Sequence, residues 1–363
     1  MNPRDALELR AGPEALAQLH ERGLRPADIT CVPAAAGGPK GLGLIPLDHR
    51  LFDVDSGWLR GAPHVELVGA SIGAWRMAAA ASADPRAALQ RLADGYVAQR
   101  YSRHPSPREV SDECRKLARA VLGGEPALRA RDGIGLSLIT ARARGVLHGS
   151  SARSSFARAA FDNALGRARL AAHLERVVFH SASARLFATA FDEFGLERVP
   201  LDRDNSEDAL LASGSIPLVC DPVRNPANAP RGDYWDGGLI DYHLLLPYGR
   251  LMDRPRRDAP GLVLYPHFVP HVTPGWLDKH LPWRARPRAH AWLDNMLLIA
   301  PSHAQLERLP NRKLPDRNDF HRYGQDHTGR ERDWRRAIAE CERFADAARA
   351  WLDAPDPSRV RPI

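Results

Sequence analysis

The segment Gly69-Ala70-Ser71-Ile72-Gly73 constrains the fold of this chain more than any other. Residues 65–68, just before it, are mostly β-branched or apolar and suit a buried strand. Residues 74–81, just after it, are mostly good helix formers. Because the two flanking glycines lack Cβ atoms, strand and helix can approach closely and a sharp turn can expose the Ser71 hydroxyl. The segment predicts a serine nucleophile on a strand-to-helix turn; a tight turn with a helix-capping serine is the alternative.

A second glycine-rich segment, Ala36-Gly37-Gly38-Pro39-Lys40-Gly41, follows the apolar run at residues 29–34. Adjacent glycines allow consecutive backbone N–H groups to point into one concavity, and a helix expected at residues 42–52 adds the positive end of its dipole. Such a nest suits a phosphate or a developing oxyanion. The spacing is not that of a Walker loop, which disfavours nucleotide binding. An ordinary strand–loop–helix turn is the other interpretation.

A third segment, Tyr234-Trp235-Asp236-Gly237-Gly238, places a carboxylate directly before two glycines. The backbone of such a loop can approach another element closely. A carboxylate within reach of a serine hydroxyl can act as a general base if it is unpaired and partly desolvated. The alternative is a plain turn in which aspartate favours the bend.

Together with a fourth landmark, Ala212-Ser213-Gly214-Ser215-Ile216-Pro217, these segments resemble the patatin-like phospholipase family. In that family a Gly-Gly-Gly-x-Arg/Lys-Gly loop forms the oxyanion hole, Gly-x-Ser-x-Gly carries the nucleophile, and Asp-Gly-Gly/Ala supplies a catalytic aspartate. The fourth landmark is similar to the family's Ala-Ser-x-Ala-x-Pro stretch. Here Ala36 stands at the first glycine of the loop. The order and separations fit, and the resemblance covers roughly residues 29–245.

The resemblance implies a Ser-Asp dyad, with Ser71 as nucleophile and Asp236 as its base. Gly37 and Gly38 would donate N–H groups to the tetrahedral intermediate, whereas Pro39 has no N–H to give. The motif positions that support these roles are Lys40, Gly41, Gly69, Gly73, Gly237 and Gly238. Lys40 would anchor the loop, attract an anionic head group, or be a solvated surface residue.

The implied activity is that of a lipid acyl hydrolase of the phospholipase A type, working through an acyl-enzyme without metal or organic cofactor. A thioesterase or short-chain carboxylesterase is the same-class alternative. A catalytically silent lipid-binding protein is the alternative from another class, because Pro39 or Ala36 could spoil the oxyanion site.

Fifteen histidines leave a Ser-His-Asp arrangement open. His243 lies near Asp236 in the sequence, and His267 and His271 follow the apolar segment 261–265. Since triad partners meet in space and not in sequence, no spacing singles out one of them. We expect most of them to be surface or satisfied core histidines.

Alternation of short apolar runs with helical patterns predicts an α/β protein, and the resemblance implies a three-layer α/β/α fold with a mainly parallel central sheet. We expect an N-terminal helix (Pro13 to Arg22) in residues 1–28, a catalytic domain at 29–250 and a C-terminal extension at 251–363 packed on it. Residues 84–130 form a helical insertion, either a layer packed on the sheet or a lid. Further predicted features are strands at 134–140, 177–181, 261–265 and 296–300, an exposed loop at 309–316 and a final helix at 333–352.

The formal charge of +7 favours acidic partners, including an anionic membrane surface contacted peripherally. The Trp- and Lys/Arg-containing segment at 275–286 suits a membrane interface or packing against the core. No recognisable motif indicates nucleic acid. No apolar run is long enough for a transmembrane segment, and the start of the chain does not read as a secretory signal. With four widely separated cysteines expected to be reduced thiols, the chain is predicted to be cytoplasmic.

Overall fold

The computed structural model describes residues 3–251, 261–285 and 290–363. Its core is an eleven-stranded sheet in the order β11-β1-β10-β9-β2-β3-β4-β5-β6, with β8 beside β4 and β7 beside β8. Most neighbouring strands in the main order are parallel; β1 with β10 and β4 with β5 are antiparallel. The strands are β1 (Leu7–Ala11), β2 (Ile29–Ala34), β3 (Val65–Ala70), β4 (Ile134–Ala143), β5 (Leu174–His180), β6 (Leu196–Pro200), β7 (Val223–Arg224), β8 (Asp233–Asp236), β9 (Leu262–Pro266), β10 (Met296–Pro301) and β11 (Arg361–Pro362).

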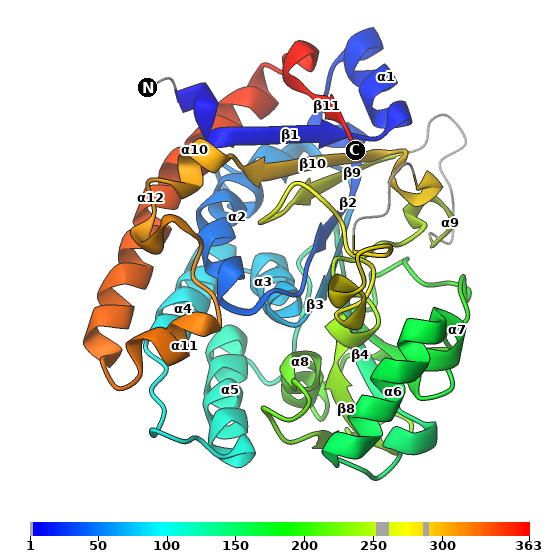
Figure 1. Ribbon diagram of the computed structural model, residues 1–363. Coiled ribbons are helices and arrows are strands. Elements are labelled where there is room, and N and C mark those ends of the chain that lie inside the picture. Colours follow the sequence, from blue (N-terminus) through cyan, green and yellow to red (C-terminus); the bar gives the residue numbers. More distant parts are fainter. Residues whose placement is uncertain (1–2, 252–260, 286–289) are drawn as a thin grey trace.

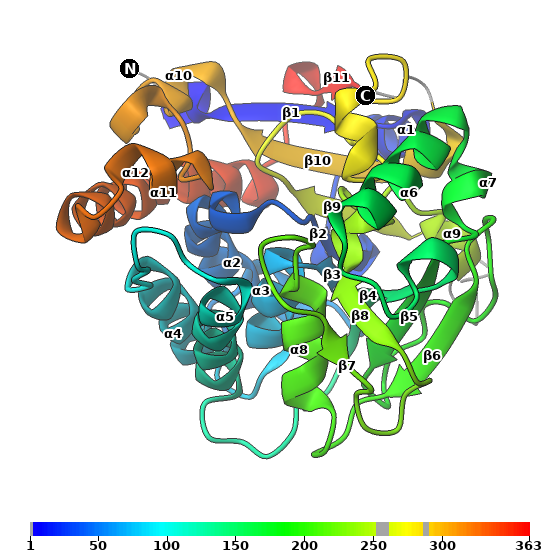
Figure 2. The ribbon, with the colours of Figure 1, turned by 60° about the horizontal axis from the view of Figure 1, so that its bottom comes forward.

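Helices cover both faces of this sheet, which gives the predicted three-layer α/β/α fold (Figure 1). The views agree that α2, α3, α4, α5 and α12 lie on one side and α1, α6 and α7 on the other (Figures 1 and 2). The helices are α1 (Pro13–Arg22), α2 (Ile45–Phe52), α3 (Ile72–Ala81), α4 (Pro85–Val97), α5 (Pro107–Leu122), α6 (Arg153–Leu165), α7 (Arg167–Leu170), α8 (Ser206–Gly214), α9 (Tyr248–Leu251), α10 (His303–Leu306), α11 (Asn318–Tyr323) and α12 (His327–Asp353). Among the described helices, none combines the length and apolar character that crossing a bilayer demands.

The centre of the sheet is buried on both faces, because helices lie above and below it. Every residue of β2, β3 and β4 is buried, as expected for strands of a covered parallel sheet. Parallel pairing places Ala34 of β2 opposite Gly69 of β3. The glycine loop after β2 and the serine turn after β3 therefore leave the sheet side by side, at the carboxyl ends of neighbouring strands.

The ends of the chain meet in the same sheet, a feature that the sequence did not reveal. Strand β1 lies between β10 and β11, so residues from the first and last parts of the chain pair directly (Figure 1). The N-terminal stretch thus contributes a strand as well as the predicted helix. The four further predicted strands and the final helix are present, with ends that differ by up to six residues from those expected.

The predicted exposed loop at residues 309–316 is wrong in part. Leu309 and Leu314 are buried, and Leu314 packs against the position of Gly43, where an added Cβ would stand 2.4 Å from Leu314 Cδ2. Prolines and charged residues made this stretch look solvent-exposed. Leu314 instead anchors it to the glycine-rich turn after β2.

Candidate active site

Ser71 stands on a sharp turn between β3 and α3. Its φ of 58° and ψ of −132° are rare for a residue with a side chain and store backbone strain of the kind that clusters at functional sites. The surrounding glycines permit this turn, because a Cβ on Gly73 would stand 1.9 Å from the Ala34 carbonyl oxygen and one on Gly69 would stand 2.4 Å from the Gly73 carbonyl oxygen. The predicted strand–turn–helix geometry is therefore present.

Residues of helix α8 accept hydrogen bonds from the serine turn and from α3. The backbone N–H of Ser71 donates to Ser213 Oγ at 2.9 Å, and the Ser213 hydroxyl donates to the Ile139 carbonyl at 2.8 Å. Trp75 of α3 donates from Nε1 to the Leu210 carbonyl at 2.7 Å. The sequence showed Ser213 only as a family landmark; the structure shows that it ties the turn to α8 and β4.

Asp236 ends β8, and the nearby Ser71 hydroxyl acts to lower the pKa of its carboxyl. The Oδ1 atom of Asp236 accepts from the Gly238 N–H at 2.7 Å, and its own N–H donates to the Ser215 carbonyl at 2.8 Å. Burial raises the pKa of Asp236, opposed by the Ser71 hydroxyl and by the charge of Arg317. A partly desolvated carboxylate near a serine hydroxyl is a suitable proton acceptor.

The glycine loop differs in one respect from the expectation. A 3-10 turn spans Gly38–Leu44 and the α-helix begins only at Ile45, not at residue 42. Glycines have low helix propensity, and this part of the turn packs tightly against α3, where a Cβ on Gly41 would stand 2.7 Å from Ile72 Cγ1. The dipole of α2 therefore begins several residues beyond Gly37 and Gly38.

Gly37 and Gly38 still present free backbone donors. Within the described residues, neither N–H group has a hydrogen-bond acceptor. Gly38 has a φ of +57°, which favours glycine, whereas Ala36 does not lie in the left-handed region and its N–H donates to the Tyr242 carbonyl at 2.9 Å. The alanine at the family's first glycine position is thus accommodated without strain.

These segments border a cavity of about 240 Å³, called here the central cavity. Of the predicted site residues, Gly37, Lys40, Asp236 and Gly238 line it. Ser71 is buried, and its hydroxyl influences the pKa of Asp236. Lining residues that sequence reasoning did not assign to the site are Ile216, Pro217, Leu239, Tyr242, Trp276, Lys279, Asp316, Arg317 and Asn318.

The histidines near the site form a buried cluster of their own. The Nδ1 atoms of His243 and His267 accept backbone N–H groups, of Thr273 at 3.1 Å and of Val269 at 3.0 Å. Burial lowers the pKa of both rings well below the ordinary value. In the described parts of the chain, no hydrogen bond or ion pair joins Asp236 to a histidine.

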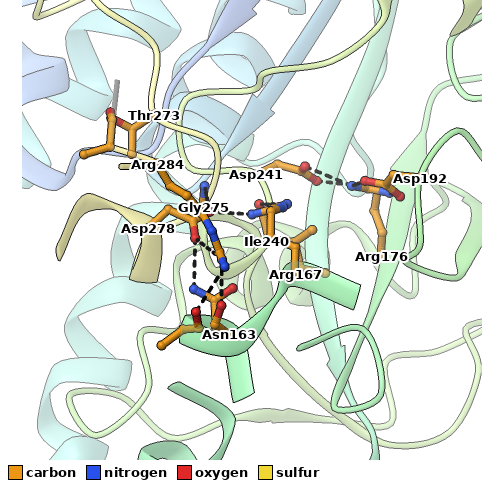
Figure 3. Close-up of polar contacts among 12 residues, drawn as sticks. Asn163, Arg167, Arg176, Asp192, Ile240, Asp241, Thr273, Gly275, Asp278 and Arg284 are labelled. Atoms are coloured by element: carbon orange, nitrogen blue, oxygen red, sulfur yellow. Dashed lines mark hydrogen bonds and ion pairs between the residues drawn. The ribbon is translucent and has the colours of Figure 1, made fainter. Parts of the chain in front are cut away.

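Buried ion pairs hold the loops around the cavity. In the helix that follows the serine turn, Arg76 of α3 donates two 2.7 Å hydrogen bonds to the Asp48 carboxylate of α2. In the loop after Asp236, Asp241 accepts from Arg176 of β5 at 2.6 and 2.9 Å, and Asp192 accepts from the same guanidinium (Figure 3). Such contacts restrict how far the two motif loops can move relative to the sheet.

A solved structure and a family model are similar to this chain. The crystal structure of VipD from Legionella pneumophila aligns at 13% sequence identity with a TM-score of 0.31, over 73% of this chain and 54% of that one. This chain therefore spans about half of VipD. No curated protein sequence matches. The family model described as patatin-like phospholipase matches residues 49–246, more than half of the chain and a range that includes Ser71 and Asp236. The chain belongs to the patatin-like phospholipase family.

Proposed function

We propose that this protein hydrolyses lipid acyl esters through a Ser71–Asp236 dyad. The observation that supports this most directly is the Ser71 hydroxyl, held on a strained turn and near enough to a buried carboxylate at the edge of the central cavity to lower the pKa of that carboxyl. The free N–H groups of Gly37 and Gly38 lie on the loop beside it. Nucleophile, base and oxyanion donors are the parts that acyl transfer requires.

In the first step, Asp236 accepts the Ser71 proton while Oγ attacks the ester carbonyl carbon. The resulting oxyanion is stabilised by the N–H groups of Gly37 and Gly38. The tetrahedral intermediate then breaks its bond to the alcohol oxygen, which takes the proton from Asp236 and leaves as the alcohol. Ser71 now carries the acyl group, and Asp236 is again a carboxylate.

In the second step, Asp236 accepts a proton from a water molecule as that water attacks the acyl-enzyme. The same N–H groups stabilise the second oxyanion. Collapse breaks the bond between the acyl carbon and Ser71 Oγ, which regains the proton, and releases the carboxylic acid. One carboxylate thus serves both half-reactions, as the raised pKa of Asp236 allows.

Labelling with a fluorophosphonate probe tests the dyad. We expect a covalent adduct on Ser71 in the wild type, none in Ser71→Ala, and labelling slowed by about 10²-fold or more in Asp236→Asn because the base is lost. The exposed Asp204 offers a matched control, since Asp204→Asn makes the same chemical change at a side chain that is 65% exposed and should leave labelling unchanged.

The labelling is run with and without phospholipid vesicles, so that a site that opens only at a lipid surface is also detected. Folding of each variant is checked by circular dichroism. A folded wild type that forms no adduct under either condition, or an adduct that persists in Ser71→Ala, contradicts the proposed dyad and favours a lipid-binding role.

A further inference from the structure

Three cationic side chains surround the central cavity. Lys40 comes from the glycine loop, Lys279 from the 3-10 turn Leu277–His280, and Arg317 from the residue just before α11. Lys279 and Arg317 lie outside residues 49–246, the part that matches the family model. The cavity of this chain is therefore completed by charges from its C-terminal third.

These cations outnumber the carboxylates that line the cavity, Asp236 and Asp316, whose charges act on Arg317 and Lys40. In the described ranges, none of the three is ion-paired with a carboxylate, and Asp316, which also lines the cavity, is paired with Lys313 at 2.9 Å. Lys279 Nζ instead lies over aromatic rings, 4.7 Å from the centroid of Trp276 and 6.0 Å from that of Tyr242. Burial, together with repulsion from Arg317 and Lys40, lowers the pKa of Lys279 to about 8. An anion in the cavity would relieve this repulsion.

Lys279 is held in place by a rigid anchor at its neighbour Asp278. The fully buried carboxylate of Asp278 accepts from Arg167 at 2.7 Å, from Asn163 at 2.9 Å and from the Gly275 N–H at 3.0 Å, with Arg284 at 3.4 Å (Figure 3). The segment that carries Lys279 is thus clamped to α6 and α7. Fixing the backbone this way reduces the entropy lost when the ammonium binds a ligand.

Arg317 is fixed by packing against the glycine loop. Its Nε lies 3.1 Å from the point where a Cβ on Gly38 would stand, so the guanidinium adjoins the backbone that would hold the oxyanion. It is also close enough to Asp236 to lower the pKa of that carboxyl. A ligand group bound by Arg317 would therefore sit next to the reacting ester.

A second, apolar pocket of about 50 Å³ adjoins the central cavity. Only apolar side chains line it, among them Phe156, Leu170 and Leu174. It shares Pro217, Leu239 and Trp276 with the central cavity. Apolar surface of this kind suits a hydrocarbon chain, so the two spaces separate a charged end of a substrate from an apolar end.

We propose that Lys279 and Arg317 bind an anionic group on the alcohol part of the ester, a phosphate or a carboxylate, while the apolar pocket takes the first carbons of the acyl chain. The proposal rests on the ester hydrolysis proposed above and adds the orientation and charge of the substrate. Two cations that converge on one space bind an oxyanion through charge-assisted hydrogen bonds. A neutral alcohol part would leave them unpaired.

Four octanoyl-type esters test this proposal: the glycerol ester, the glycerol phosphate ester, the glyceric acid ester, and a glycerol ester whose acyl chain ends in a carboxylate. We expect kcat/KM of the wild type to be at least about tenfold higher for the two esters with an anionic alcohol part than for the neutral one. Comparing the glycerol phosphate ester with the glyceric acid ester shows which anion is preferred. In Lys279→Gln the anionic-to-neutral ratio should fall about tenfold, mainly through KM, and Arg317→Lys should retain more of it than Arg317→Gln.

Lys116→Gln is the matched control, because this lysine is 72% exposed on α5 and should leave the ratio unchanged. Equal rates on neutral and anionic esters, an unchanged ratio in Lys279→Gln, or preference for the ester charged on its acyl chain would overturn the proposal.

Calorimetric binding to the Ser71→Ala protein keeps the test independent of turnover. Octanoyl glycerol phosphate should bind at least about tenfold more tightly than octanoyl glycerol, and this difference should shrink when Lys279→Gln is added. If no ester is hydrolysed but this difference holds, the proposed catalysis fails and the anion site stands. If esters are hydrolysed without this difference, the anion site fails alone.

Discussion

At the scale of single residues, the site depends on a carboxylate in surroundings that oppose its charge. Asp236 is buried, yet three contacts favour its ionised form: the Ser71 hydroxyl, the Gly238 N–H and the charge of Arg317. Because burial is the largest of these influences, the pKa of Asp236 is raised. The pKa of the proposed base is therefore tuned by the residues around it, and Arg317 is the charged one among them.

This tuning predicts the acidic limb of the pH profile. Since only the carboxylate can accept the Ser71 proton, kcat/KM for a neutral soluble ester should fall as pH falls through the raised pKa of Asp236, above the ordinary aspartate value of 3.8. Removing a positive charge raises that pKa further, so Arg317→Gln should move the limb to higher pH, and Arg317→Lys should move it less. A limb at the ordinary value, or a shift to lower pH in Arg317→Gln, would show that Asp236 is not the titrating base.

At the scale of elements, α3 is joined by side-chain hydrogen bonds to both α8 and α2. Arg76 is paired with Asp48 of α2, with exposed side-chain fractions of 1% and 0%. A buried bidentate pair of this kind specifies how two helices pack. Replacing both residues by apolar ones of similar volume often leaves the free energy of unfolding unchanged or raises it. The pair lies in the middle of α3 and fixes the helix that begins at Ser71.

Replacing only one residue of this pair should destabilise the protein strongly. We expect Arg76→Leu or Asp48→Leu to lower the free energy of unfolding by about 3–5 kcal/mol, and the double variant to lose less than either single one, because a lone buried charge is then avoided. The exposed pair Arg335–Asp94 between α12 and α4 is the control, and its single variants should cost about 0–1 kcal/mol. Urea unfolding measures all of these values. Additive losses in the double variant would argue against a coupled buried pair.

At the scale of the whole molecule, the C-terminal part of the chain completes both the sheet and the cavity. Strands β9, β10 and β11 extend the sheet beyond β2, and residues 276, 279, 316, 317 and 318 line the cavity. Asp278 links this part to α6 and α7, more than a hundred residues earlier in the chain (Figure 3). The cavity wall is thus assembled from distant segments held by one buried carboxylate.

Removing the Asp278 carboxylate should increase the mobility of residues 273–285, which form part of the cavity wall. Asp278→Ala leaves Arg167 and Arg284 without their shared partner, so we expect amide hydrogen exchange in residues 273–285 to rise by about 10²-fold or more, while exchange in β2 and β3 stays slow. Hydrolysis of esters should weaken in parallel because Trp276 and Lys279 lose their positions. Asp204→Ala serves as the exposed control. Unchanged exchange in residues 273–285 would mean that other contacts hold the segment.

The features determined by the sequence alone are those that depend on neighbouring residues. The turn at Ser71 needs glycine before and after it, and the end of β8 needs Asp236 followed by two glycines; both requirements are visible in short motifs because backbone sterics act locally. The apolar runs likewise predicted the central strands of an α/β protein, and the family resemblance implied the three-layer fold. Even the local prediction failed where packing decided, since the helix after the glycine loop begins at Ile45 and not at residue 42.

Only the tertiary structure decided which distant residues join these motifs. No spacing pointed to Arg317, to the support of Ser71 by Ser213, or to the burial of Leu314, because each depends on segments tens to hundreds of residues apart meeting across the sheet. Strand β1 pairs with β10 and β11 for the same reason. Local propensity acts within a few residues, whereas the environment of a site depends on which surfaces the whole chain must bury together.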